Sequence, residues 1–484
     1  MATIAPTARP VATRPVATRP VATLPDPFDE GVAVGAHATE HDRRVRASLD
    51  ARDLAALSAV VAGEAASHGV CFGGADGERK FRIDPVPRIL DAAQWAELSA
   101  GVAQRVRALE LFVRDVYGAQ AIVREGVVPE RALAGAEHYE PQLAGAGERV
   151  RSWITVAGLD VVRDADGAFK VLEDNVRTPS GIAYAVATRE ALEAHLPTPP
   201  GLRVRSLDAA FATLGEALRR AAPASAGERP TIVLLSDGER NSAFYEHATI
   251  ARALAIPLVL AGQLRVRDGR LLARIDGGER AVDVVYRRTD EDRLTDDDGS
   301  PTRVGELLLE PILAGTLACV NAFGAGVADD KLLHAYVEDM IRFYLGERPL
   351  LPSVPTYDPA QPGVLEMILE RIGELVVKPR SGHGGYGVVV GPHARAEDLR
   401  ATAERLQAAP ERFVAQETVM LSRHPTVIDG RLQPRHIDLR PFAISTDGRV
   451  HVLPGGLTRV AFDAGALVVN SSQNGGSKDT WVLA

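Results

Sequence analysis

The chain has few cysteines and no long apolar run. Cys71 and Cys319 are the two cysteines in 484 residues, too few for a disulfide framework, so we expect a reducing, cytoplasmic compartment. No apolar run reaches the roughly 18 residues that cross a membrane. The N-terminus also lacks the charged-then-apolar order of a signal peptide. We therefore expect no membrane partner.

An excess of basic charge is also missing. The 55 Lys and Arg residues stand against 64 Asp and Glu, a formal net charge of −9, which argues against a general nucleic-acid surface. The hydrophobic fraction of 46% and the charged fraction of 25% are those of an ordinary globular protein. The length suggests about three structural units. The oligomeric state stays open, a homo-oligomer included.

The N-terminal third divides into a tail and a helical region. Residues 1–26 contain the sequence Arg-Pro-Val-Ala-Thr three times; a Pro-rich repeat of five residues cannot build a helix or a strand ladder, so we expect a disordered tail. Residues 27–150 should be mainly helical, because 94–117 carry an apolar stripe at three-to-four spacing. The prolines of 81–87 should hold that segment extended.

The middle of the chain changes to strand patterns. In residues 151–200, one strand from Trp153 to Val162, a turn at 164–167 and a returning strand at 169–175 predict an antiparallel hairpin. In 201–328, predicted helices at 207–221 and 247–255 alternate with strands at 231–235, 257–260 and 282–286. This alternation predicts a parallel sheet.

Residues 329–484 should combine a lysine-bearing segment with further strands. We expect a helix from Asp330, an extended Pro-rich segment at 349–362, and a strand ending at Lys378 before a glycine loop. The remaining strands are predicted at 413–416, 436–442, 450–454, 457–462 and 467–470.

The predicted hairpin carries acidic chemistry. Residues two apart on a strand face the same side, so Glu173 and Asn175 should point together, and Asp160 on the paired strand can meet them. Three oxygen donors on one face suit Mg²⁺, which takes few protein ligands plus phosphate oxygens. The alternative is a solvated strand face.

The lysine strand and its glycines suit a polyphosphate. Glycines let backbone N–H groups wrap an anion, and a lysine adds a point charge. The glycines of this loop are Gly382, Gly384, Gly385 and Gly387. The loop is not a Walker A motif, because Lys378 precedes the glycines, and not a dinucleotide fingerprint, because 388–390 read as a strand. The alternative is a hairpin turn with a surface lysine.

Arginines mark two further candidate anion sites. Arg440 and Arg459, with Arg435, lie on or beside predicted strands, where each must meet either a carboxylate such as Asp438 or a bound triphosphate. Arg287 and Arg288 close a strand of the predicted parallel sheet, at whose carboxyl edge ligands collect. These two either bind an anionic substrate or form surface salt bridges. The polar loop 470–476 is a tail turn or a binding loop.

Together these motifs resemble the ATP-grasp superfamily in circularly permuted order. Residues 330–333 and 377–379 look like its two lysine elements, 414–419 like its adenine hinge, and 438–440, 458–459 and 470–476 like the segments that follow. The metal hairpin, which closes the usual order, lies instead at 158–177. Residues 173–181, 453–459 and 475–481 are close to the hallmarks of circularly permuted ATP-grasp proteins.

The resemblance implies an α/β fold: a circularly permuted ATP-grasp core, a Rossmann-like layer before it and an N-terminal helical region. It also implies an ATP- and Mg²⁺-dependent, ADP-forming carboxylate–amine ligase that acts through an acylphosphate. Glutathionylspermidine-synthase-like ligases are the nearest in kind. The partners would be a small acid and an amine, such as an amino acid, a peptide or a polyamine. A kinase acting on an acid or hydroxyl, and a non-catalytic nucleotide-binding subunit, are the alternatives.

The same resemblance assigns roles by residue. The metal ligands would be Asp160, Glu173 and Asn175; the nucleotide would contact Lys331, Lys378, Gly382, Gly384, Gly385, Gly387, Gln416, Glu417, Val419 and Asn470; catalysis would rest on Arg440, Arg459 and Lys378; and the substrate would meet Arg287, Arg288 and Arg177.

Overall fold

The structure is a computed structural model that describes residues 25–31, 39–74, 77–147, 150–296, 298–382, 386–465 and 475–484. Almost all of the predicted tail, together with Gly384, Gly385, Asn470 and the predicted strand at 467–470, lies outside the described residues. Within the described part of the chain, no helix is both long enough and apolar enough to cross a lipid bilayer.

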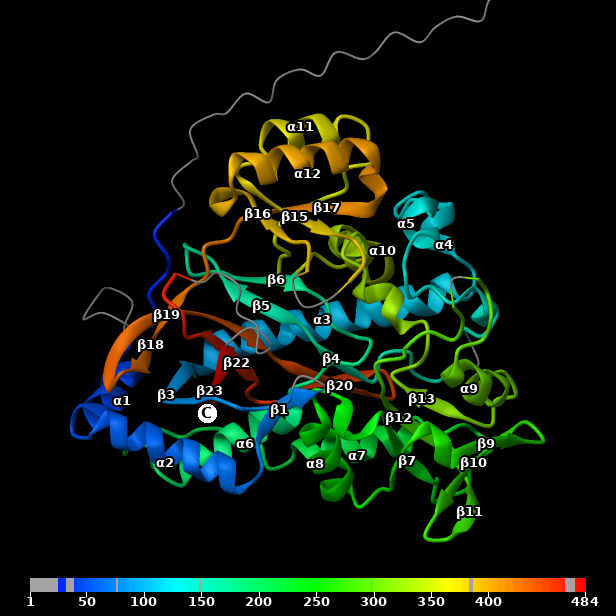
Figure 1. The fold of residues 1–484 in the computed structure, drawn as a ribbon, viewed down its shortest axis with the longest axis horizontal. Coiled ribbons are helices and arrows are strands. Elements are labelled where there is room, and N and C mark those ends of the chain that lie inside the picture. The colour runs from blue at the N-terminus through cyan, green and yellow to red at the C-terminus, as the bar shows by residue number, and fades with distance from the viewer. Residues whose placement is uncertain are drawn as a thin grey trace, which may run out of the picture.

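A central, mostly antiparallel sheet joins segments from both ends of the chain. Its strands run in the order β3-β23-β22-β19-β5-β6, with β18 also paired to β19 (Figure 1). They are β3 (Ile83–Leu90), β5 (Asp160–Arg163), β6 (Phe169–Glu173), β18 (Arg423–Ile428), β19 (Arg431–Arg440), β22 (Leu457–Ala461) and β23 (Gly475–Val482). The predicted acidic hairpin and the predicted arginine strands therefore belong to one sheet.

A separate small sheet carries the predicted lysine strand. Its order is β14-β17-β15-β16, from β14 (Thr356–Tyr357), β15 (Leu375–Pro379), β16 (Val389–Val390) and β17 (Phe413–Glu417). Helices α11 (Val364–Glu370) and α12 (Ala396–Ala408) cover it, and in Figure 1 this lobe lies above β5 and β6. Figure 1 and the bond from Gln416 Nε2 to the carbonyl of Leu172 on β6 (3.2 Å) place the lobe against the acidic hairpin.

The predicted parallel sheet is confirmed. Strands β7 (Ile232–Ser236), β8 (Leu258–Val259), β12 (Val284–Arg288) and β13 (Ala318–Val320) pair in parallel in the order β13-β12-β7-β8. The helices of this region are α7 (Ala210–Arg220), α8 (Phe244–Leu254) and α9 (Arg303–Leu313). A meander of β9 (Leu264–Arg267), β10 (Arg270–Ile275) and β11 (Gly278–Ala281), which we did not predict, is inserted before β12.

The long helix α3 (Ala92–Val116) confirms the predicted apolar stripe. Asp91 and Gln94 form a reciprocal capping box at its start. The stripe from Trp95 to Phe112 is buried in the main core. The other elements are α1 (Glu40–Asp50), α2 (Leu54–Ser67), α4 (Ala121–Arg124), α5 (Glu130–Ala134), α6 (Ile182–Glu193), α10 (Val337–Leu345), β1 (Cys71–Gly74), β2 (Gly77–Lys80), β4 (Val156–Gly158), β20 (Phe442–Thr446) and β21 (Arg449–Val452). Short 3₁₀ helices lie at Pro141–Leu143, Gly238–Arg240, Ala261–Gln263, Ala325–Asp329, Leu333–Tyr336, Gly391–His393 and Pro410–Arg412.

One predicted strand is wrong, and strand β23 was not predicted. The single strand predicted from Trp153 to Val162 is divided: β4 pairs with β20 in one sheet, and β5 pairs with β6 and β19 in another. The polar segment at 475–481, which we had not assigned to a strand, is β23. Its polar side chains can be buried because each meets a partner: Lys478 pairs with Asp84, and Thr480 bonds Thr458 (2.8 Å).

One helical prediction also needs correction. The helix expected from Asp330 begins at Val337, after a 3₁₀ turn, because the Asp330 carboxylate accepts the backbone N–H groups of Leu332 (2.9 Å) and Leu333. The region 27–150 holds strands beside its helices α1 to α5. It contributes β3 to the central sheet, consistent with the extended conformation expected at 81–87.

Glu30 ties the first described segment to the central sheet. Its carboxylate accepts from Arg88 Nε (2.8 Å) and Nη2 (2.7 Å) and from Ser422 Oγ (2.6 Å). Burial alone would raise the pKa of Glu30, but Arg88 and Arg163 outweigh it and lower the pKa to about 2.

The Glu30→Gln variant should lose roughly 3–5 kcal/mol of unfolding free energy at pH 7, because it leaves buried guanidinium groups unpaired. Since the folded pKa of Glu30 lies below its ordinary value of 4.5, the difference from wild type should be constant above about pH 5 and shrink as pH falls toward 2. Urea denaturation at several pH values measures it. Asp29→Asn, which removes a partly exposed pair with Arg423, is the control and should cost under about 1 kcal/mol. A Glu30→Gln effect that does not change with pH would contradict the pairing.

Candidate active site

Two predicted metal ligands face each other across the hairpin. Asp160 on β5 pairs in register with Glu173 on β6, and the two carboxyl groups lie close enough to shift each other's pKa. Burial and then the charge of Asp160 raise the pKa of Glu173. Strand β6 ends at Glu173, so the rule that residues two apart on a strand face the same side does not apply to Asn175. The buried Nδ2 of Asn175 has no hydrogen-bond partner among the described residues.

Arginines from β19 and β22 converge on the same carboxylate. Arg440 Nε and Nη2 donate to Oδ1 (2.6 Å) and Oδ2 (2.9 Å) of Asp160, and Arg459 Nη2 donates to Oδ2 (2.7 Å). Burial opposes the ionised form of Asp160, but both guanidinium groups outweigh it and hold its pKa far below the usual value. Arg459 also pairs with Asp438. Arg440 and Arg459 therefore pair with carboxylates, one of the two predicted alternatives, whereas Arg435 donates to the carbonyls of Phe462 (2.7 Å) and Pro434 (2.8 Å).

Both predicted lysines lie at this cluster. Lys378 Nζ donates to Gln416 Oε1 (2.6 Å). Burial lowers the pKa of Lys378, with the nearby charge of Glu173 acting against that shift and the charge of Lys331 adding to it. Lys331 Nζ donates to the carbonyl of Gly382 at 2.6 Å. Segments about two hundred residues apart in the sequence therefore meet in one buried electrostatic cluster.

The predicted adenine hinge is held by side-chain contacts. Gln416 Nε2 donates to Thr356 Oγ1 (2.9 Å) as well as to the hairpin. Glu417 is held by both Nη atoms of Arg371 (2.8 and 2.9 Å) and by the hydroxyl of Tyr357 (2.6 Å). Val419 packs in a small apolar cluster. Contact of these residues with a nucleotide stays a prediction.

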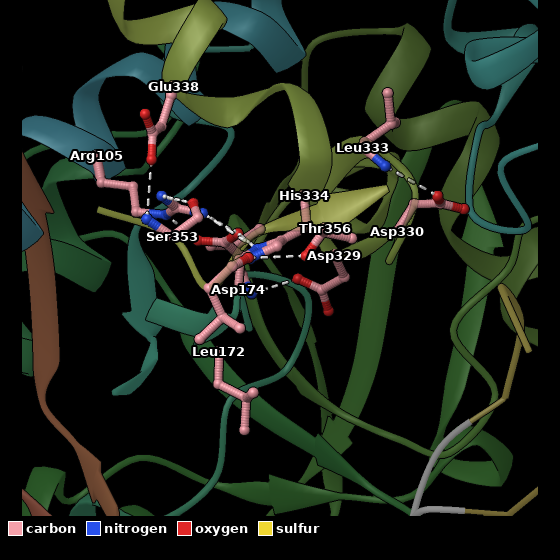
Figure 2. A network of polar contacts seen from close by, with 12 residues as sticks. Arg105, Leu172, Asp174, Asp329, Asp330, Leu333, His334, Glu338, Ser353 and Thr356 are labelled. Atoms are coloured by element: carbon pink, nitrogen blue, oxygen red, sulfur yellow. Dashed lines mark hydrogen bonds and ion pairs between the residues drawn. The ribbon is translucent and has the colours of Figure 1, made fainter. Parts of the chain in front are cut away.

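A buried network that we did not predict fixes the end of the hairpin (Figure 2). Arg105 on α3 donates Nε and Nη2 to Oδ1 (2.6 Å) and Oδ2 (2.8 Å) of Asp174, and His334 Nδ1 lies 2.7 Å from Oδ2. Arg105 Nη1 also donates to Ser353 Oγ (2.9 Å). Asp174 lies between two predicted metal ligands, and His334 lies three residues after Lys331. The network therefore fixes the hairpin against α3 and the lysine-bearing segment. The sequence held one signal of this network: Arg105 is a charged residue within the apolar stripe of α3.

The three arginines predicted to meet substrate have different environments. Neighbours on β12 point to opposite faces: Arg288 pairs with Glu246 (2.9 Å), donates to the carbonyl of Pro179 (2.8 Å) and bonds Ser180. Arg177 pairs with Asp292 and lies 2.8 Å from His138 Nε2. Arg287 is fully buried, and neither Nε nor Nη1 has a hydrogen-bond partner in the described part of the chain.

The donor set fits a hard cation that also takes phosphate oxygens. Within the described ranges, no group of three or more His, Cys, Asp or Glu side chains is placed to hold a metal ion by itself. The buried pair of Asp160 and Glu173 would gain from a nearby positive charge, because the pKa of Glu173 is raised. The amide of Asn175 is unpartnered, and Asp160 would have to share its oxygens with Arg440 and Arg459.

A lysine lobe facing an acidic hairpin and arginine strands is the arrangement of an ATP-grasp protein, as the resemblance predicted. The family model described as "Circularly permuted ATP-grasp type 2" matches residues 87–461, and the chain belongs to this family. An uncharacterized protein of Mycobacterium tuberculosis is 43% identical over 444 residues, which cover 90% of this chain and 80% of that protein.

Two further similarities come from a relative with a functional name and from a solved structure. A Frankia alni protein named "Putative glutamate--cysteine ligase 2-3" is 45% identical over 430 residues, 87% of this chain but 49% of that protein, so the chain spans about half of it. The structure of a glutathione synthetase-like effector from Globodera pallida, in its apo form, matches with a TM-score of 0.57 and 12% identity, covering 92% of this chain and 98% of that one. An identity this low shows the fold alone.

Arg105→Gln should destabilise the protein by roughly 3–5 kcal/mol, because it leaves Asp174 buried without its main counter-charge. Arg107→Gln, on the same helix but 43% exposed in its pair with Glu347, should cost less than about 1 kcal/mol. Chemical denaturation measures both. Equal costs would show that the network does not hold the hairpin.

Proposed function

We propose that this protein is an ATP-dependent, ADP-forming ligase that joins a carboxylate to an amine through an acylphosphate. The observation that supports this most strongly is the single cluster of Asp160, Glu173, Lys378, Arg440 and Arg459, drawn from five strands of two sheets. Its alternating positive and negative groups suit a metal-bound triphosphate, for which catalysis is mainly positioning and charge neutralisation.

The proposed ligands of the nucleotide follow from this cluster. Glu173 and Asn175, with Asp160, would hold Mg²⁺, which when bound neutralises charge on the phosphates. Lys331, Lys378 and the glycine loop from Gly382 to Gly387 would hold phosphate oxygens. Gln416, Glu417 and Val419 would line the adenosine side, and Asn470 would contact the nucleotide. Lys378 would exchange its present bond to Gln416 Oε1 for one to a phosphate oxygen.

The proposed reaction needs no side-chain nucleophile. A carboxylate oxygen of the acid attacks the γ-phosphorus, and ADP leaves. The nitrogen of the amine then attacks the acyl carbon, phosphate leaves with the bonding electrons, and the amine loses a proton as the amide forms. Arg440 and Arg459, now paired with Asp160, would shift part of their hydrogen bonding to the transferring group and the developing oxyanion.

The comparisons support a ligase at a coarser level than this scheme. The family is an ATP-grasp family, and one relative carries the name of a glutamate–cysteine ligase. Because the chain spans about half of that relative, its named substrates are not assigned here. The proposed partners remain a small acid and an amine of amino acid, peptide or polyamine type.

A screen of ADP release with Mg²⁺ against pooled amino acids, polyamines and short peptides tests the proposal. A ligase should release ADP in proportion to product only when an acid and an amine are both present. Full turnover with an acid alone would instead identify a kinase, and an absence of ATP binding would contradict both.

Lys378→Ala should lower the rate of ADP release by roughly a hundredfold or more, because it removes a preorganised positive charge from the phosphates. Lys170→Ala is the matched control: Lys170 lies on β6 beside the site but pairs with Asp164 at the hairpin turn. Its rate should stay near that of the wild type. Normal turnover in Lys378→Ala would remove this lysine from its assigned role.

Glu173→Gln should separate stability from activity. Since burial and the charge of Asp160 raise the pKa of Glu173, its ionised form is disfavoured in the folded protein, and the amide should keep or raise the melting temperature at pH 8. Mg²⁺-dependent ADP release should nevertheless be lost. A variant that is less stable yet still active would contradict the assignment of Glu173 as a metal ligand.

A further inference from the structure

We infer that Arg287, together with Arg177 and His138, forms a second anion-binding subsite that receives a free carboxylate group of a substrate, separate from the arginines at the nucleotide. The inference rests on the proposed function in one respect, because only that function makes the bound carboxylate compound a substrate. The geometry of the subsite stands on its own, because it depends on side chains outside the proposed nucleotide cluster.

Arg287 is a buried cation that forms no ion pair with any residue in the described ranges. It is 1% exposed, its guanidinium group lies over the ring of Phe323 at 4.4 Å from the centroid, and its Nε and Nη1 have no hydrogen-bond partner in the described part of the chain. Burial lowers the pKa of Arg287 to about 10, so the group is still charged at neutral pH. A buried charge without a partner is costly, and it persists where an absent anion supplies the partner.

Two further donors of the same region are also incompletely paired. Arg177 Nε and His138 Nδ1 are buried and have no hydrogen-bond partner among the described residues. Burial and then the charges of Arg177 and Arg287 lower the pKa of His138 to about 3, so its imidazole is neutral and donates from one nitrogen only. The three side chains come from distant segments, so their convergence is a product of the tertiary fold.

The two carboxylates that form ion pairs in this region, Asp292 and Asp329, form them with Arg177. Asp292 forms its ion pair with Arg177 and lies 3.6 Å from His138 Nδ1. Asp329 accepts the N–H of Val176, and burial raises the pKa of Asp329 to about 7, so much of it is protonated near neutral pH. Asp329 also lies 3.5 Å from Arg177 Nε, so both carboxylates pair with Arg177, and none of the ion pairs found among the described residues includes Arg287. A carboxylate ligand would supply the acceptors that Arg287 Nε and Nη1 lack in the described part of the chain.

The subsite is distinct from the proposed phosphoryl-transfer centre. Arg440 faces Asp160 and the carbonyl of Ser180, whereas Arg287 faces Phe323 and the region of Asp292. The segment from Arg177 to Ser180 runs between the two, with Arg177 at one end and Ser180 at the other. A reacting carboxylate at Arg440 and a second, unreacted carboxylate at Arg287 can thus be bound together.

The ligand class is a compound that keeps a free carboxylate during the reaction. Two sources share this chemistry: a second carboxylate on the acid, or the carboxylate of an amino acid that acts as the amine. Bidentate contact between guanidinium and carboxylate favours either over a neutral amide or a simple amine.

The test compares melting temperatures of the full chain with saturating Mg²⁺ and ADP at constant ionic strength. The probes are glutarate and L-alanine, which carry free carboxylates, and glutaramide and ethylamine, which do not. Glutarate or L-alanine, but not the neutral or amine probes, should raise the melting temperature of the wild type. Arg287→Met should weaken that effect roughly tenfold or more in apparent affinity, the loss expected for a charge-assisted contact. A response to glutarate alone indicates the acid as the source, and one to L-alanine alone indicates the amine.

Arg288→Met is the matched control, because the next residue of β12 has its partners in Glu246, Pro179 and Ser180. Without any probe, Arg288→Met should lower the melting temperature, whereas Arg287→Met should leave it unchanged or raise it, since methionine replaces an unpaired buried charge. If Arg287 instead has a structural role and pairs with Asp292 in solution, Arg287→Met should lower the melting temperature.

Three results would overturn the inference: no shift of the wild type with either carboxylate, an unchanged shift in Arg287→Met, or a fall in the melting temperature of Arg287→Met without probe that matches Arg288→Met. The same experiment also measures how far Mg²⁺ and ADP, without any probe, shift the melting temperature of the protein. If that shift is present, a negative result rejects the subsite alone; if it is absent, the proposed function fails whatever the probes show.

Discussion

The buried carboxylate of Asp160 is the constraint on which the rest of the structure depends. Asp160 is 2% exposed and can stay ionised there because Arg440 and Arg459 both donate to it. Those contacts fix β5 against β19, and they place the side chain of Arg459 on β22 at the same carboxylate. The neighbouring Glu173 lies close enough to Lys378 on the lysine lobe for each charge to shift the other's pKa. One buried charge thereby holds β5, β19 and β22 together at the proposed nucleotide site.

The order of segments along the chain matters less than their place in the sheet. The acidic hairpin precedes the lysine lobe in sequence, yet β5 and β6 occupy the edge of the central sheet next to β19. The far edge is closed by β23, near the C-terminus, and β3, near the N-terminus, which pair in parallel. A circular permutation keeps these neighbours and changes the loops that join them. The match of the family model over residues 87–461 agrees with that arrangement.

The sequence predicted what periodicity and local chemistry determine. The stripe of α3, the parallel sheet and the pairing of Asp160 with Glu173 follow from spacing alone. The missed features depend on partners that are distant in sequence. Strand β23 reads as a polar tail until Asp84 and Thr458 supply its buried contacts, and the role of Arg105 depends on Asp174, 69 residues away. The unpaired state of Arg287, in contrast to its neighbour Arg288, can be recognised only in three dimensions.

The central claim is that the acidic hairpin and the lysine lobe enclose one magnesium-bound nucleotide between them. A crystal structure with Mg²⁺ and a non-hydrolysable ATP analogue tests it most directly. The account predicts the metal at Glu173 and Asn175, with Lys378 and Lys331 on the phosphates and Arg440 turned partly from Asp160 toward the γ-phosphate. A nucleotide bound elsewhere, with the pairs of Asp160 and Lys378 unchanged, would contradict it.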